Sequence, residues 1–286
     1  MMQGLAGRHD PAVKPHHDRP MDLIRRTAIA SLLLATTVVW AMTGVAAPAI
    51  VPASPEQSAA QRSDFTDAEI LDGFFKVALN AEWRTGESAD RVRRFDGAVR
   101  VFIDSRGTPN RRDETAAIVR DIGERIEHLD IAIVDQRENA NFIVTLVNDA
   151  AIADTIRTIF GADRAKEILQ DLDPQCLSGF RRDNTFRIEH AETVVVVDAG
   201  DFQFRDCAYE EILQALGPIN DDDSLPWSTF NDTIQHGGFT VYDQLILNLL
   251  YHPDIRPGMT RAQIEKLAPD ILPSIRTFVE SRNTQR

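Results

Sequence analysis

The residues with the clearest capacity for chemistry lie on one predicted helix and the turn that follows it. Glu210 and Gln214 are four residues apart and share a helix face, with Glu211 beside them. Gly217 can adopt a positive φ and end the helix, which would return Asn220 toward the same face. Carboxylate and amide oxygens would then converge, and Glu211 would be a candidate general base.

The spacing of these residues resembles the metzincin zinc-peptidase signature, H-E-x-x-H-x-x-G-x-x-H. In that family the three histidines bind zinc and the glutamate is the general base. Here the glycine and Glu211 match the signature, whereas Glu210, Gln214 and Asn220 stand at the three histidine positions. The resemblance implies a zincin-like scaffold whose ligand positions have changed from imidazole to carboxylate and amide oxygen.

A second resemblance covers most of the chain, from about Phe65 to Ile275. Residues 207–221, together with the later segment from Thr240 to Met259, are similar to an exported bacterial family, the domain of unknown function 2927. Members of that family are exported and have an E-E-x-x-Q-x-L-G…N-D block. The resemblance implies a fold of zincin-like type and no particular activity.

Zinc is not expected at this site, because amide oxygens are poor zinc ligands and a catalytic zinc needs about three protein ligands. Four histidines lie beyond the N-terminal leader, and no two of them are four residues apart: His128, His190, His236 and His252. Oxygen ligands with Asp221 suit calcium or magnesium better, but the loop lacks the alternating spacing of an EF-hand. The expected cofactor is none, with calcium or magnesium as the alternative.

Three interpretations of the segment remain open. The preferred one is an internal polar network of Glu210, Gln214 and Asn220 that closes a former metal site, and these three with Asp221 are the candidate binding residues. The second is an ordinary exposed helix face, which would not need the continuation after Gly217. The third is an active hydrolase with Glu211 as base. Glu210 and Glu211 are a poor catalytic pair, because neighbours on a helix point about 100° apart.

Three further residues are weaker candidates. Tyr242 is placed to stabilise an oxyanion, although its spacing to Leu245 and Leu249 favours a helix core. His236 is the one histidine in a predicted loop near the motif. It is a candidate substitute ligand, and the alternative is a solvated loop side chain. Met259 resembles the methionine turn beneath metzincin zinc sites, and it suits equally a turn into the next helix.

Hydrophobic periodicity predicts the elements that must position these residues. Strands are expected over 98–103, 130–135, 142–147 and 193–198, the last being apolar throughout as in a central strand. One helix is expected after a capping box at Thr66, and another, marked by Ile118, Ile122 and Ile126, ends at about His128. Further helices are expected over 152–172, 207–216 and 241–250. A helix capped at Thr260 and a last helix follow, divided by Pro269 and Pro273. Cys176 falls in an expected loop, and 218–239 is irregular.

This order predicts an α/β (α+β) fold, a zincin-like layered domain with a mixed sheet of about four to five strands and a helical C-terminal part. We expect residues 1–49 to be a signal peptide or membrane anchor, 50–64 a linker, and 65–282 a single domain. Arg25 and Arg26 precede an uncharged apolar run over 27–45, as in a signal peptide. Met1 and Met21 are both possible starts, and cleavage is expected after Ala49.

Composition excludes other classes. A charged fraction of 26% and an aromatic fraction of 7% exclude a multispan membrane protein. Removing residues 1–49 takes away five basic and three acidic residues and moves the net charge from −13 to −15, which argues against nucleic-acid binding. Both cysteines, Cys176 and Cys207, stay in the exported part, where a disulfide is favoured over two buried thiols.

The sequence therefore predicts an exported envelope protein, periplasmic or secreted, with a non-hydrolytic binding domain. The expected partner is a peptide, a protein or a cell-wall component, and membrane contact involves only the N-terminal segment. The alternative is a peptidase-like hydrolase that uses Glu211 with an atypical metal or none.

Overall fold

The computed structural model describes residues 9–10, 62–79, 90–171 and 174–284. The predicted leader, apart from His9 and Asp10, and the linker as far as residue 61 lie outside these ranges. Within them, no helix combines the length and the apolar character that a bilayer-spanning segment needs.

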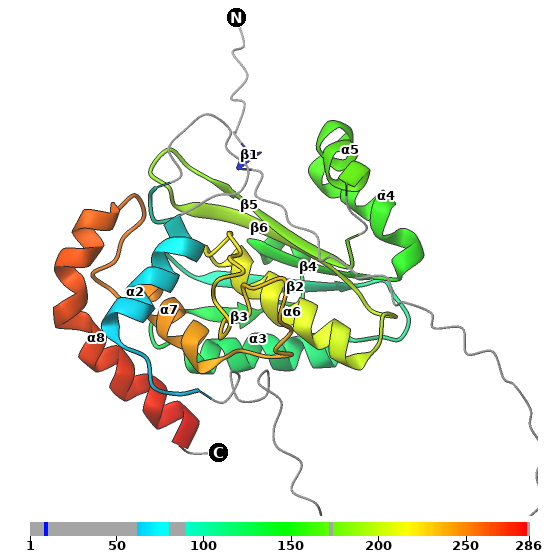
Figure 1. The fold of residues 1–286 in the computed structure, drawn as a ribbon. Helices are drawn as coiled ribbons and strands as arrows, with labels where there is room; N and C mark the ends of the chain where they lie inside the picture. Colours follow the sequence, from blue (N-terminus) through cyan, green and yellow to red (C-terminus); the bar gives the residue numbers. More distant parts are fainter. Residues whose placement is uncertain (1–8, 11–61, 80–89, 172–173, 285–286) are drawn as a thin grey trace, which may run out of the picture.

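A mixed sheet of five strands lies at the centre of the domain (Figure 1). Its strands are β2 (Val99–Ser105), β3 (Ile131–Ile133), β4 (Phe142–Val147), β5 (Cys176–Arg182) and β6 (Ile188–Val196). The spatial order is β5-β6-β4-β2-β3, with β5 antiparallel to β6 and the other neighbours parallel. A two-residue strand, β1 (His9–Asp10), pairs antiparallel with the outer edge of β5.

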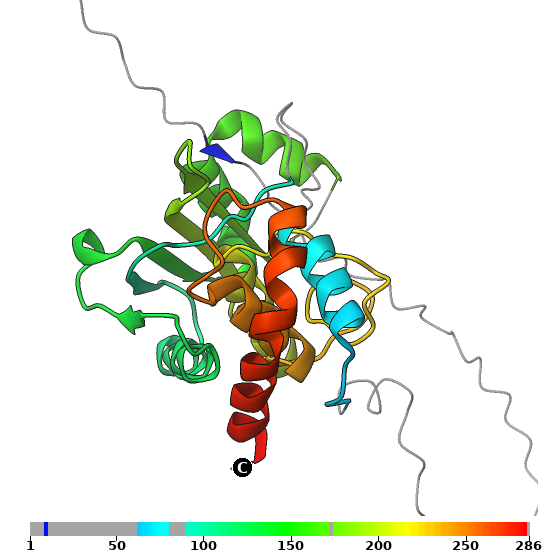
Figure 2. The same ribbon diagram turned by 90° about the vertical axis from the view of Figure 1, so that its left-hand side faces the viewer.

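Helices cover both faces of the sheet through two separate cores. The larger core holds α2 (Asp67–Phe74) with its π-helical continuation Phe75–Leu79, α3 (Arg112–Arg125), α6 (Asp201–Ala215), α7 (Val241–Tyr251) and α8 (Arg261–Thr284). The smaller core holds α4 (Asp149–Phe160) and α5 (Ala162–Asp171) on the opposite face. A 3-10 turn, Arg137–Asn139, joins β3 to β4. Figure 2 shows α8 running beside α2. The predicted α/β class with a helical C-terminal part is confirmed.

The central strand β6 is apolar because each of its faces meets a different core. Val195 packs into the larger core, whereas Val194 and Val196 pack against α4 and α5. The predicted capping box is also present, since Thr66 Oγ1 accepts from the Glu69 amide and Glu69 accepts from the Thr66 amide. Burial and capping together explain why these two elements could be predicted.

Two predicted secondary-structure assignments are wrong. The segment expected as one helix over 152–172 is two helices, because Gly161 lies between them with φ 84° and ends α4. The segment around Cys176, expected as a loop, is the strand β5. Its Ser178 and Gly179 interrupt the apolar run, and burial at the sheet edge, rather than strand propensity, explains why it is extended.

Two helix boundaries also differ from the prediction. The motif helix α6 begins at Asp201, six residues before the expected start at Cys207. Pro269 and Pro273 do not divide the C-terminal part, because α8 continues through both. Ile264, Ala268 and Leu272 on one face of α8 are fully buried, and this packing outweighs the backbone hydrogen bonds that the two prolines remove.

Candidate functional site: a buried polar network on α6

The helix α6 is buried on nearly all sides, although four of its buried side chains are acids or amides: Asp206, Glu210, Glu211 and Gln214. It follows β6 in the chain, packs against β5 and β6, and is joined to β5 by the Cys176–Cys207 disulfide. Glu210, Glu211 and Gln214 are each no more than 5% exposed. The interpretation of this helix as an exposed polar face is therefore wrong, and the predicted disulfide is confirmed.

Three of these polar side chains, Asp206, Glu210 and Gln214, follow one another at four-residue intervals and so lie along one face of α6. Asp206 Oδ1 accepts a 2.7 Å hydrogen bond from the amide of Gly237. At the other end of the row, Gln214 Oε1 accepts from Ser178 Oγ of β5 at 3.2 Å. The row therefore connects the sheet to the segment over 218–239.

The turn at Gly217 brings Asp221, rather than Asn220, back to this row. Gly217 has φ 140°, and a Cβ there would lie 2.3 Å from the carbonyl oxygen of Arg93. Beyond the turn, Gln214 Nε2 donates a 2.8 Å hydrogen bond to Asp221 Oδ1. The glutamine at the second ligand position of the signature is thus hydrogen-bonded through both ends of its side-chain amide.

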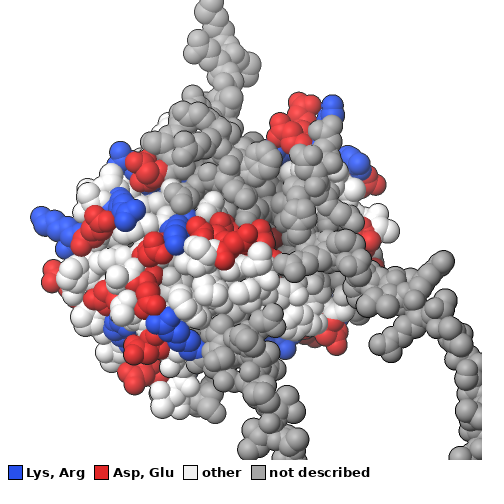
Figure 3. All heavy atoms as spheres, in the orientation of Figure 1, with Lys and Arg blue, Asp and Glu red and all other residues white. Residues whose placement is uncertain are grey.

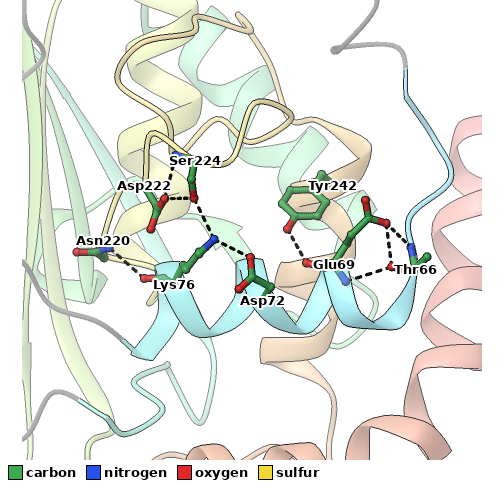
Figure 4. A network of polar contacts seen from close by, with 8 residues as sticks. All are labelled: Thr66, Glu69, Asp72, Lys76, Asn220, Asp222, Ser224 and Tyr242. Carbon is green, nitrogen blue, oxygen red and sulfur yellow. Dashed lines mark hydrogen bonds and ion pairs between the residues drawn. The ribbon is translucent and has the colours of Figure 1, made fainter.

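Asn220 instead fastens the turn to the end of the α2 segment. Its Nδ2 donates to the carbonyl oxygens of Lys76 at 3.0 Å and Asp221 at 2.9 Å, and its amide donates to Val77 at 3.2 Å. Figure 4 shows this contact together with Lys76 Nζ, which bridges Asp72 and Ser224. The residue at the third ligand position therefore has a positioning role in the fold.

Glu210, at the centre of the row, shares its surroundings with two carboxylates from the following segment. One oxygen each of Glu210, Asp221 and Asp232 lies within 4.8 Å of the others. Burial, followed by the charges of Asp221, Glu211, Asp206 and Asp232, raises the pKa of Glu210 well above its usual value. The protonated carboxylic acid is favoured here, because like charges at this separation disfavour joint ionisation.

The group of Glu210, Asp221 and Asp232 offers oxygen atoms only. Such donors suit hard cations such as calcium or magnesium, whereas a zinc site of the metzincin kind needs imidazole. Among the described residues it is the one group of three close carboxylate, imidazole or thiolate ligands. Asp232 could not be identified from the sequence, because it lies in an irregular segment with no spacing that relates it to α6.

Glu211, the candidate base, is 2% exposed and its backbone oxygen accepts from Thr193 Oγ1 of β6 at 3.3 Å. A general base must come within hydrogen-bond distance of the proton that it removes. The Glu211 carboxylate is buried, so a substrate cannot reach it in this conformation.

Tyr242 lies in the core between α7 and α2. Its hydroxyl donates a 2.6 Å hydrogen bond to the carbonyl oxygen of Glu69 (Figure 4). Its ring centroid is 4.7 Å from that of Phe65. Burial raises the pKa of this hydroxyl. Glu69 lies in α2, whereas Lys76, which Asn220 contacts, lies seven residues later in the π-helical continuation, so Tyr242 and Asn220 contact different ends of this helical segment (Figure 4).

His236 and Met259 lie outside the group of three carboxylates. Burial lowers the pKa of His236, while the charge of the nearby Asp206 opposes this shift. Met259 packs against the larger core, and its carbonyl oxygen accepts from the amide of Val92 at 3.0 Å. Neither residue joins Gln214 or Asn220 in the network.

The irregular segment over 218–239 is also held by Asp243, a buried carboxylate of α7. Asp243 is fully buried and accepts hydrogen bonds from Ser228 Oγ at 2.6 Å, the Thr229 amide at 2.8 Å and Thr240 Oγ1 at 2.7 Å. Burial raises the pKa of Asp243 to about 6, although these hydrogen bonds oppose the shift. The segment over α6 is thus anchored at its middle and at its end.

These features define an α/β domain in which buried polar side chains of α6 are hydrogen-bonded to β5 and to the segment over 218–239. The chain belongs to the family described as Protein of unknown function (DUF2927), whose model matches residues 67–270. No curated protein and no solved structure matches the chain.

Proposed function

We propose that this protein is a non-hydrolytic binding domain on a zincin-like scaffold, active outside the cytoplasm. The observation that carries the proposal is the bonding of the residues at the second and third ligand positions. Gln214 is hydrogen-bonded to Ser178 and Asp221, and Asn220 to the α2 segment. Side chains that are buried and bonded in this way hold a fold together and are not available to a metal or a substrate.

The location outside the cytoplasm is supported by the leader pattern and by the disulfide. Cys176 and Cys207 are bonded, and both side chains are buried. Disulfides persist in oxidising compartments and are rare in the cytosol. On the face drawn in Figure 3, acidic and basic side chains are interspersed, with no broad basic area of the kind that a nucleic acid would require.

The proposed partner is an extended peptide segment that adds a strand to the outer edge of β5. The Val196 amide donates to the Gln175 carbonyl, so the alternation of an antiparallel pair turns the backbone groups of Ser178 and Phe180 outward. Asp10 of β1 already lies opposite Phe180 at this edge. An unpaired edge is a template for strand addition, and main-chain hydrogen bonds supply the affinity.

The predicted cleavage after Ala49 would remove β1 and leave this edge to a partner. In that case a segment of the leader would occupy the edge only before processing. Among the described residues of the leader, His9 and Asp10 lie opposite Arg181 and Phe180 of β5.

The test is a fluorescence titration of the protein, processed after Ala49, with a decapeptide selected from a random library. We expect saturable binding that protects the β5 amides from hydrogen exchange. A second decapeptide, N-methylated on alternate residues, should not bind, because it lacks the donors that pair with β5. Equal binding of both peptides, or protection confined to another element, would refute the strand-addition proposal.

A further inference from the structure

The guanidinium group of Arg62 lies against two aromatic rings from distant parts of the sequence. Its central carbon is 4.5 Å from the ring centroid of Phe65 and 4.5 Å from a ring centroid of Trp227. The two rings contact each other edge to face, with centroids 5.7 Å apart. Phe65 is buried and Trp227 is half-buried. Aromatic faces attract cations, and a flat guanidinium stacks on them well, so these rings form a cation site that Arg62 fills.

The carboxylate of Glu69 completes this site. Arg62 Nη2 lies 2.8 Å from Glu69 Oε1 and 3.0 Å from Oε2. Hydrogen bonds from Thr66, with a smaller contribution from Arg62, hold the pKa of Glu69 below its usual value (Figure 4). Because Thr66 is the N-cap of α2 and stays in place without Arg62, the site keeps its negative charge when the arginine leaves.

Arg62 is carried by a segment without regular secondary structure. Residues 62–66 precede α2 and form neither a helix nor a strand. Arg62 is the one basic residue between Ala49 and Lys76, so no other cation of the expected linker can take its place. The side chains of Arg62 and Glu69 are 33% and 30% exposed, which leaves the site open to solvent. A second arginine can therefore compete with Arg62 for the same rings and carboxylate.

We propose that Phe65, Trp227 and Glu69 form a binding site for an arginine side chain of a partner polypeptide, which enters in exchange for Arg62. A guanidinium is favoured over an ammonium, because it stacks on a ring while its in-plane N–H groups donate to a carboxylate. The exchange releases the linker from α2. It also places the partner against Trp227, in the segment over 218–239 that contacts the α6 network.

The test is an NMR titration of the exported, nitrogen-15-labelled protein, as wild type and R62A. The probe is a blocked pentapeptide with one arginine between glycines, and the signal is the indole N–H of Trp227, identified by its loss in W227F. We expect the peptide to shift this signal saturably in R62A. Wild type should require a concentration at least about tenfold higher, because Arg62 competes from within the chain at a high effective concentration.

Two matched peptides test the chemistry of the ligand. Citrulline in place of arginine keeps the shape and removes the charge, and this peptide should give no saturable shift in R62A. A lysine peptide should bind more weakly than the arginine peptide. The double variant R62A/E69Q should weaken arginine binding by at least about threefold, since glutamine retains the capping box but not the charge. R62Q, which keeps a polar side chain of similar reach, repeats the measurement made with R62A.

Four results would overturn the proposal: no saturable shift with the arginine peptide in R62A and R62Q, equal shifts with the arginine and citrulline peptides, binding of the lysine peptide as tight as that of the arginine peptide, or equal affinity in wild type and R62A. The proposed strand addition does not depend on any of these results, because β5 contributes no residue to this site.

Discussion

Gln214 and Asp221 are joined by a 2.8 Å hydrogen bond across the turn at Gly217, inside the fold. The other end of the Gln214 amide accepts from Ser178, so a single side chain joins α6 to β5 and to the segment after the helix. In the signature that α6 resembles, this position is a zinc-binding histidine. Here Gln214 joins three parts of the fold, and removal of its side chain should lower the free energy of unfolding.

We predict that Q214A lowers the free energy of unfolding by about 3 kcal/mol, because it leaves a buried carboxylate and a buried hydroxyl without this partner. Urea denaturation followed by circular dichroism measures the change. The matched control is Q235A, at an exposed glutamine whose amide donates to Gln203, and it should change stability by less than about 0.5 kcal/mol. Equal effects of the two substitutions would contradict the structural role of Gln214.

Gly217 is predicted to be intolerant of any side chain. Its φ of 140° disfavours other residues, and a Cβ would approach the Arg93 carbonyl oxygen to 2.3 Å. We expect G217A to cost more than about 2 kcal/mol in thermal or urea unfolding. G97A is the control, because nothing lies within 4 Å of a Cβ at that glycine. A G217A protein as stable as G97A would show that the turn is not built as described.

Asp243 should make stability depend on pH. Its pKa is raised by burial to about 6 from an unfolded value near 3.8, so between these values the folded state holds a proton that the unfolded state has lost. Stability due to this group is therefore fully present below about pH 4 and falls by up to about 3 kcal/mol as the pH rises through 6.

The measurement is urea unfolding at several pH values for wild type and D243N. The substitution removes the ionisable group and should reduce the fall in stability between pH 4 and pH 6.5. An unchanged pH profile in D243N would assign the dependence to another group, such as Glu210, whose pKa is also raised.

The Cys176–Cys207 disulfide closes a loop with a sequence separation of 31 residues between β5 and α6. In the chain-entropy model a loop of this length contributes about 3–4 kcal/mol. We expect the C176S/C207S double variant to lose that amount in urea unfolding, and thiol labelling of the unreduced exported protein to find no free cysteine. Two labelled thiols in the exported protein would count against both the bond and the proposed compartment.

Much of the scaffold could be predicted because burial has a strong signature in its strands. The apolar run at Val194–Val197 marks the central strand, and the pairs Thr66–Glu69 and Thr260–Gln263 mark helix starts. β5 was not predictable in this way. Its extended conformation depends on pairing with β6 and on packing against α6, and both are tertiary contacts.

The candidate site was predictable in part. The helix face with Glu210 and Gln214 follows from their spacing, but Asp206 belongs to the same face and was hidden by placing the helix start at Cys207. The choice between Asn220 and Asp221 as the partner of Gln214 depends on the φ of Gly217, which no spacing reveals. Asp232 reaches Glu210 through an irregular segment, where sequence separation carries no geometric information.

The central claim, that the α6 network belongs to a non-hydrolytic domain, is tested most directly by peptide cleavage. A mixed peptide library is incubated with wild type and with E211Q, with and without added zinc, and the products are identified by mass spectrometry. We predict the same intact peptides in every sample, because Glu211 is buried beside Glu210 and no imidazole is present at the three ligand positions. Cleavage by wild type that is lost in E211Q would contradict the account.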